Sequence, residues 1–115
     1  MTLPEAVAKL CSIPADFRRD PDATVRSLLE ASGYERFRNK VTVAELQKYL
    51  SLHPELVEAW MAYSEGRQVQ TGWCLDGLIV GFYLPGQGMM KQERFPEQTQ
   101  ACAEFIQREM DTLLG

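Results

Sequence analysis

The chain has 115 residues, of which 45% are hydrophobic and 24% are charged, the composition of one globular domain. This balance excludes a disordered, collagen-like or low-complexity chain. The 16 acidic residues outnumber the 12 basic ones, and the net charge of −4 argues against nucleic acid as the main partner. We expect a single domain over residues 1–115, in which residues 1–20 could form a peripheral N-terminal segment.

The sequence favours a cytoplasmic protein with no membrane partner. No stretch approaches the roughly 20 apolar residues that a membrane span needs, and the N-terminus shows no cationic and apolar leader pattern. The three cysteines, Cys11, Cys74 and Cys102, match neither a zinc-ligand spacing nor a C-x-x-C redox motif. We therefore expect reduced, partly buried thiols, although one disulfide is also compatible with this number.

Two helices are predicted in the N-terminal third of the chain. Thr2 and Glu5 have the spacing of a capping box, which predicts a short helix that ends near residue 11. Asp20-Pro21 has the pattern of a second helix start, because Asp is a common N-cap and Pro fits the first helical position. This second helix is expected over residues 21–32.

Two further helices are predicted in the middle of the chain. Thr42 and Glu45 form a second capping box and begin the third helix. His53-Pro54 ends that helix and begins the fourth, because Pro is tolerated in the first turn of a helix and not in its interior. The two helices should therefore meet at an angle.

Beyond residue 69 the apolar pattern changes from the period of a helix to the alternation of a strand. Asp76-Gly77 is a strong signal for a two-residue hairpin turn. This turn predicts that Leu75 pairs with Leu78 and Trp73 with Val80, which places the large apolar side chains on one face.

The same register places Gly72 opposite Gly81 on the other face of the predicted hairpin. Such a pair indicates either a twist or bulge, or a shallow groove that the side chains of neighbouring residues would flank. Those neighbours are Gln70, Cys74, Ile79 and Tyr83.

A third strand is expected over residues 89–95, because a lone hairpin is marginally stable in water. An apolar stripe then predicts a last helix, formed by Cys102, Phe105, Ile106, Met110 and Leu113. The predicted fold class is α+β, with N-terminal helices, an antiparallel hairpin or three-stranded sheet, and a C-terminal helix packed on the sheet.

The sequence predicts no catalytic, cofactor-binding or metal-ligating residue. His53 is the single histidine, so a His–His metal pair is impossible within one chain. No phosphate-binding loop motif occurs, and the carboxylates are scattered over predicted helix surfaces. The mixed basic and aromatic segment from Phe17 to Lys40 is interpreted as a solvated surface, ahead of a protein or nucleic-acid contact.

The densest polar cluster runs from Tyr63 to Arg67, between the fourth helix and the hairpin. Arg67 could pair with Glu65 or with the last helix, and polar loops on a rigid scaffold are also common binding sites. Together with neighbouring acids and the sheet face, the candidate partner-binding residues are Glu58, Tyr63, Glu65, Arg67, Gln70, Asp76, Tyr83 and Glu93.

The stretch Trp60–Arg67, followed by Gly72-Trp73, resembles a group of small, functionally unassigned bacterial proteins with a W-x-x-Y-S-E-x-x-R stretch before a G-W strand. Residues 101–109 resemble the closing A-C-A-x-F-I-x-x-E helix of that group, and the chain departs from the pattern at Gly66 and Cys74. The resemblance implies the fold. It also suggests an immunity-type role, because some similar small proteins are immunity partners of bacterial toxins.

The leading hypothesis is a non-enzymatic protein-binding module, most concretely an immunity-type protein that neutralises a toxin by occlusion, as a monomer or homodimer. Residues 41–115 carry five basic and ten acidic groups, which favours a basic partner. One alternative is a homo-oligomeric adaptor that uses an exposed sheet edge. Another is a small-ligand-binding protein or enzyme around Cys74, Tyr83 and Arg67, which requires a lowered thiol pKa.

Overall fold

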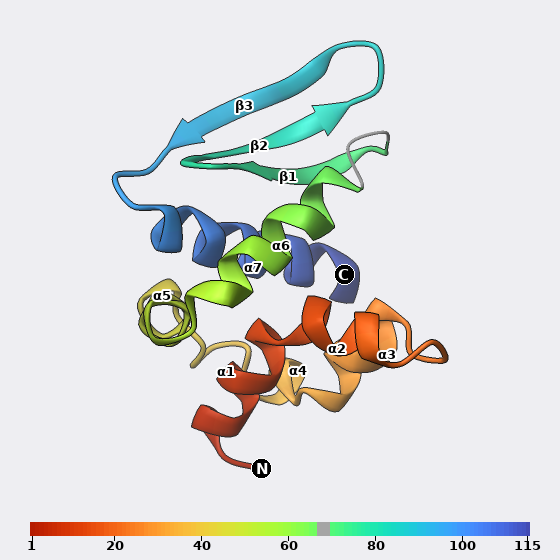
Figure 1. Ribbon diagram of the computed structural model, residues 1–115, viewed down its shortest axis with the longest axis vertical. Helices are drawn as coiled ribbons and strands as arrows, with labels where there is room; N and C mark the ends of the chain where they lie inside the picture. The colour runs from red at the N-terminus through yellow and green to blue at the C-terminus, as the bar shows by residue number, and fades with distance from the viewer. Residues whose placement is uncertain (67–69) are drawn as a thin grey trace.

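The computed structural model describes residues 1–66 and 70–115, and within them a three-stranded antiparallel sheet lies at one end of a body of helices (Figure 1). The predicted α+β fold class is confirmed. The elements in chain order are α1 (Leu3–Cys11), α2 (Ile13–Arg19), α3 (Val25–Ala31), α4 (Tyr34–Phe37), α5 (Val43–Leu52), α6 (Pro54–Glu65), β1 (Gly72–Asp76), β2 (Ile79–Leu84), β3 (Gly88–Arg94) and α7 (Gln98–Leu114).

Three of the four predicted helix starts are confirmed. Thr2 is the N-cap of α1, and Thr42 is the N-cap of α5, where its hydroxyl oxygen accepts from the Glu45 amide at 3.2 Å. His53 separates α5 from α6, which begins at Pro54. Figure 1 shows the expected change of direction at this junction, since α5 is seen end-on while α6 crosses the view.

The predicted start at Asp20-Pro21 is wrong. Asp20 forms a local turn instead, in which its Oδ1 accepts from the Asp22 amide at 3.0 Å. The helix begins at Val25, because Thr24 and Ser27 form a reciprocal capping box there. The short helices α2 and α4 were not predicted from the sequence.

The hairpin turn lies one residue further along the chain than predicted, which shifts the pairing of the strands by two residues. Asp76 pairs with Ile79, so Gly77 and Leu78 form the loop, and Gly77 supplies the positive φ of 60° that a primed turn needs at its first central position. Leu75 therefore pairs with Val80, not with Leu78. Because the shift is by two residues, each side chain keeps its predicted face. The predicted strand start at Val69 lies outside the described residues.

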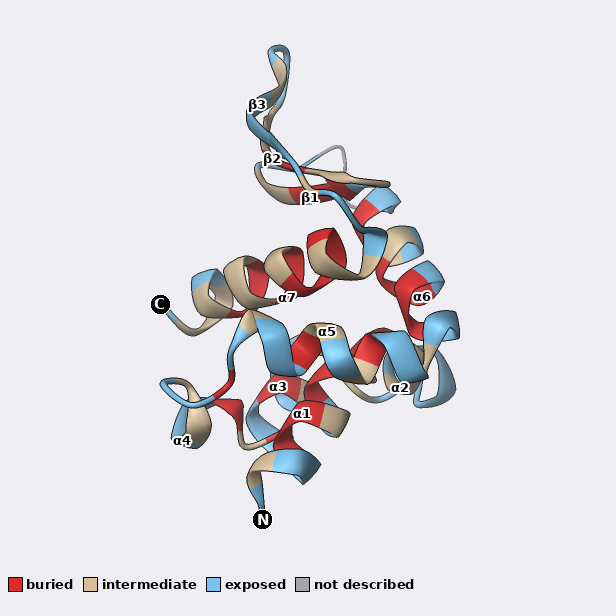
Figure 2. Ribbon diagram, turned by 90° about the vertical axis from the view of Figure 1, so that its left-hand side faces the viewer, coloured by how far each residue is buried: buried red, intermediate tan, exposed pale blue. Residues whose placement is uncertain are grey.

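The third strand is confirmed as β3, and it contains an irregularity. Val80 pairs with Glu93 and Phe82 with Met90, so two residues of β3 face the single Gly81 of β2. Lys91, the first of these, has a φ of 52°, in the left-handed region. This β-bulge interrupts the outer edge of the sheet. Figure 2 shows the sheet standing out from the helical body, with β1 next to α7 and β3 farthest from it.

The core lies between the N-terminal helices and α7, and the buried positions of α7 face it (Figure 2). Residues 1–20 are part of this core and not a peripheral segment, since Leu10, Cys11 and Ile13 are fully buried. Trp60 links α6 to the end of α1, because its ring nitrogen donates to the Cys11 carbonyl at 2.8 Å. No helix among the described residues is long and apolar enough to cross a membrane.

Candidate functional site

Three of the predicted contact residues present free carboxylates. Glu58 and Glu65 are exposed on α6, and their spacing of seven residues places them on one side of the helix. Asp76 is exposed at the end of β1, the strand that lies beside α6 (Figure 1). None of the three pairs with a cation among residues 1–66 and 70–115. We refer to Glu58, Glu65 and Asp76 as the acidic surface.

Two other predicted contact residues make bonds within the fold. Glu93 of β3 lies 3.1 Å from the Arg108 guanidinium, which also contacts Glu104 at 3.3 Å and covers the Trp73 ring at 5.2 Å. This cluster holds β3 and β1 against α7. The Tyr63 hydroxyl donates to the buried Glu109 carboxylate at 2.9 Å, so Tyr63 holds α6 against α7 in the same way.

The remaining candidates are spread over the molecule. Gln70 is exposed just before β1, and Tyr83 of β2 is half-buried opposite Gly72. Arg67 lies outside the described residues. The predicted patch is therefore not one continuous cluster: the structure brings Glu58 and Glu65 together on α6, and it places Tyr83 on a separate sheet face.

The predicted groove between two glycines is wrong. Gly72 pairs with Tyr83, and Gly81 pairs with Cys74. The Met89 side chain lies over Gly81, and a Cβ atom there would overlap Met89 Cγ and lie 3.0 Å from the Met90 carbonyl oxygen. Gly81 therefore serves close packing within the sheet, and Cys74 beside it is 2% exposed.

The three thiols are free and buried. Burial raises the pKa of the Cys74 thiol, whose Sγ lies 3.6 Å from the Gly81 carbonyl oxygen. Burial also raises the pKa of Cys102, and it raises the pKa of Cys11 to about 12. A reactive cysteine needs the opposite shift, since the thiolate is the nucleophile. These thiols are suited to packing.

Stability should fall at alkaline pH because of Cys11. Its pKa rises from the ordinary 9.0 to about 12 on folding, so the folded chain holds a proton that the unfolded chain releases. The stability that this group contributes is complete below pH 9 and declines up to about pH 12, by about 1.4 kcal/mol per pH unit. Urea unfolding between pH 8 and 11 measures this slope. Cys11→Ala should make the slope shallower without removing it, because the raised pKa values of Cys74 and Cys102 act in the same pH range. An unchanged slope would contradict the assignment.

A cavity of about 510 Å³ lies between α2, α3, α6 and the end of α7. Two predicted contact residues, Tyr63 and Gln70, are at its wall. Two arginines, Arg18 and Arg26, also line it. Both belong to the basic and aromatic segment that the sequence analysis interpreted as a solvated surface. The remaining lining is mostly apolar: Pro14, Phe17, Val25, Ala59, Ala62, Gly66 and Leu113.

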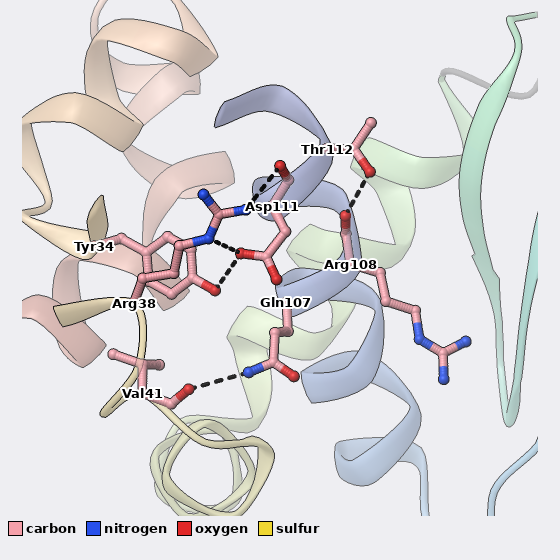
Figure 3. A network of polar contacts seen from close by, with 7 residues as sticks. All are labelled: Tyr34, Arg38, Val41, Gln107, Arg108, Asp111 and Thr112. Carbon is pink, nitrogen blue, oxygen red and sulfur yellow. Dashed lines mark hydrogen bonds and ion pairs between the residues drawn. The ribbon is translucent and has the colours of Figure 1, made fainter. Parts of the chain in front are cut away.

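The end of α7, which supplies one wall of this cavity, is fixed by a polar network around Asp111 (Figure 3). The Tyr34 hydroxyl donates to Asp111 Oδ1 at 2.7 Å, and Arg38 Nε donates to the same oxygen at 3.0 Å. One turn earlier, the Gln107 amide donates to the Val41 carbonyl at 3.0 Å. Arg26 donates to the Leu113 carbonyl at 2.9 Å from the α3 side.

The chain matches no protein-family model, no curated protein and no solved structure. The resemblance carried by Trp60–Arg67 therefore stays a prediction. Within the described residues, no group of His, Cys, Asp and Glu side chains is placed to hold a metal ion. The acidic surface and the arginine-lined cavity are the two features on which a function can be argued.

Proposed function

We propose that the protein is a non-enzymatic protein-binding module for a basic partner, most concretely a cytoplasmic immunity-type protein that neutralises a toxin by occlusion. The acidic surface is the observation that carries this proposal. Its carboxylates are exposed and pair with none of the described cations, so their full charge is available to a partner. Net charge −4 adds a field of the same sign.

Electrostatic complementarity mainly accelerates association and selects the partner. An acidic inhibitor that meets a basic enzyme gains a fast, salt-sensitive encounter, which is the property that rapid neutralisation of a toxin needs. In this proposal Glu58, Glu65 and Asp76 make the first contacts. Gln70, just before β1, and Tyr83, on the separate sheet face, would make further contacts outside this surface. The bonds of Glu93 and Tyr63 within the fold keep the sheet and α6 in place.

The alternative of a homo-oligomer that pairs through an exposed sheet edge is less well supported than the binding module. The outer edge of β3 is interrupted by the bulge at Lys91, and three of its last four residues are charged. Both features oppose strand pairing with a second copy. The enzyme alternative needs a reactive thiol at Cys74, where burial instead raises the pKa.

The test is a pull-down of the tagged chain from cells that naturally express it, with charge-reversal variants. Glu58→Lys/Glu65→Lys alters the acidic surface. Asp22→Lys/Glu35→Lys is the matched control, since both pairs are exposed and both double variants bring the net charge from −4 to zero. We expect a stoichiometric partner with the wild type and the control. Association with the α6 variant should be about tenfold slower at low salt.

Equal association rates for the two double variants would refute the acidic surface, and the absence of any partner would refute the module. The immunity role has its own readout. Expression of the partner alone should arrest growth of a bacterial host, and co-expression of this chain should restore it. A harmless partner would leave a binding module and remove the immunity interpretation.

A further inference from the structure

We propose that the cavity between α2, α3 and α6 binds a small apolar molecule that carries one carboxylate. This ligand site is separate from the acidic surface and does not depend on the proposed function. The argument rests on the size of the cavity, on its apolar lining and on the position of two guanidinium groups.

The cavity has the size and composition of a small-molecule site. Its volume of about 510 Å³ falls within the range of roughly 300 to 1,000 Å³ that such sites span. Ala59 and Ala62 of α6 present only methyl groups to it, so the helix leaves space there. Val25 and Leu113 close the apolar wall. A ligand that fills this space therefore has an apolar body.

The charged groups at the cavity select an anion. Arg18 is exposed and makes no hydrogen bond or ion pair with any residue in 1–66 or 70–115. Arg26 is held in place, since it donates to the Leu113 carbonyl at 2.9 Å and its Nε lies 3.4 Å from Glu30. Of the two arginines described at the cavity, Arg18 is thus the one without a partner among these residues, and its planar guanidinium matches a carboxylate with two parallel hydrogen bonds.

An exposed aromatic ring completes the site. Phe17 is 44% exposed although it is a large apolar side chain, and it lines the same cavity as Arg18. A ligand whose apolar part covers this ring removes apolar surface from water. The carboxylate then lies at Arg18, and the apolar body extends past Phe17 toward Ala59 and Ala62.

The probe is decanoate, compared with decyltrimethylammonium, which has the same chain length and the opposite charge. Isothermal titration below the micelle concentration measures both. We expect saturable one-to-one binding of decanoate and at least tenfold weaker binding of the cation. Arg18→Gln should weaken decanoate about tenfold, the loss typical of one charge-assisted pair. Arg19→Gln is the matched control, because Arg19 is exposed on the same helix and does not line the cavity.

A second pair of variants tests the apolar part. Ala62→Trp should fill the cavity and abolish binding, whereas Ala44→Trp, an exposed position on α5, should leave binding unchanged. Circular dichroism checks that each variant is folded. Lys48→Gln tests the smaller cavity of about 280 Å³ between α1 and α5. We expect this variant to bind decanoate as tightly as the wild type.

Three results would overturn the proposal. They are no saturable binding of decanoate, equal affinity for decanoate and decyltrimethylammonium, or a loss of decanoate affinity in Lys48→Gln and not in Arg18→Gln. None of these outcomes bears on the acidic surface, whose charge-reversal variants leave the cavity residues intact. The two proposals therefore fail separately.

Discussion

Replacing Trp60 by alanine should lower the free energy of unfolding by about 3 to 5 kcal/mol, because it removes a large side chain from a packed core. Trp60 is fully buried, and its ring lies edge-on to Tyr63 at 5.4 Å and Phe105 at 6.0 Å. Its ring nitrogen also donates to the Cys11 carbonyl. The loss would be a large part of the 5 to 15 kcal/mol typical of one domain. Urea unfolding followed by circular dichroism measures it.

Two control variants separate the contributions of Trp60. Trp60→Phe keeps most of the apolar volume but leaves the Cys11 carbonyl without its donor, which should cost about 1 to 3 kcal/mol. Trp73→Ala changes the other tryptophan, which is only partly buried against Phe82 and Arg108. It should cost less than Trp60→Ala. An equal or greater loss would mean that the core does not centre on Trp60.

Helix starts that depend on neighbouring residues could be predicted from the sequence. The Thr42 cap needs only Glu45, three residues away, and the break at His53-Pro54 follows from the proline ring itself. Asp20-Pro21 failed because an Asp side chain can stabilise a turn as well as a cap. The competing start, at Thr24 and Ser27, is also local, but it lacks the Glu or Gln by which a capping box is usually recognised.

The sheet shows what a pattern of alternation determines and what it leaves open. Alternation assigned Trp73, Leu75, Val80 and Phe82 to one face, and that assignment holds. It did not decide between two turns one residue apart, since the registers that they produce differ by two residues and keep the same faces. The bulge at Lys91 and the packing of Met89 over Gly81 depend on contacts between strands, which no local signal encodes.

The candidate site residues show the same difference between what local sequence signals predict and what depends on tertiary contacts. Exposure of Glu58 and Glu65 follows from helical periodicity, so it could be predicted. The bonds of Tyr63 and Glu93 to α7 required the tertiary structure, because their partners are 46 and 15 residues away. Arg18 was not chosen as a site residue because acidic residues interleave with the basic ones of its segment, which was interpreted as a solvated surface. The unpredicted helix α2, which has Pro14 in its first turn, carries Arg18 to the cavity.

Replacing Asp111 by alanine should lower the free energy of unfolding by about 2 to 3 kcal/mol, since one carboxylate accepts from two side chains (Figure 3). Tyr34 accounts for most of this loss, because it is fully buried and its hydroxyl would lose the Asp111 acceptor. Burial and the Asp111 bond both raise the pKa of Tyr34. Arg38 contributes less, as its side chain is 36% exposed.

A double-mutant cycle isolates the Tyr34–Asp111 bond. Tyr34→Phe and Asp111→Ala, alone and combined, should show a coupling of about 1 kcal/mol or more. Asp16→Ala is the control, because the partly exposed Asp16 lies 4.0 Å from Arg19 and should change stability by less than about 0.5 kcal/mol. Additive losses from Tyr34 and Asp111 would contradict the network drawn in Figure 3.

The same variant connects stability with the ligand site. Asp111 does not line the cavity, but Leu113, two residues later, does. The Asp111 network and the Arg26 bond to the Leu113 carbonyl hold the end of α7 from two sides. Asp111→Ala therefore removes one of two restraints on a cavity wall, and we expect weaker decanoate binding although Arg18 is untouched. Unchanged affinity in the folded variant would show that Arg26 alone positions this wall.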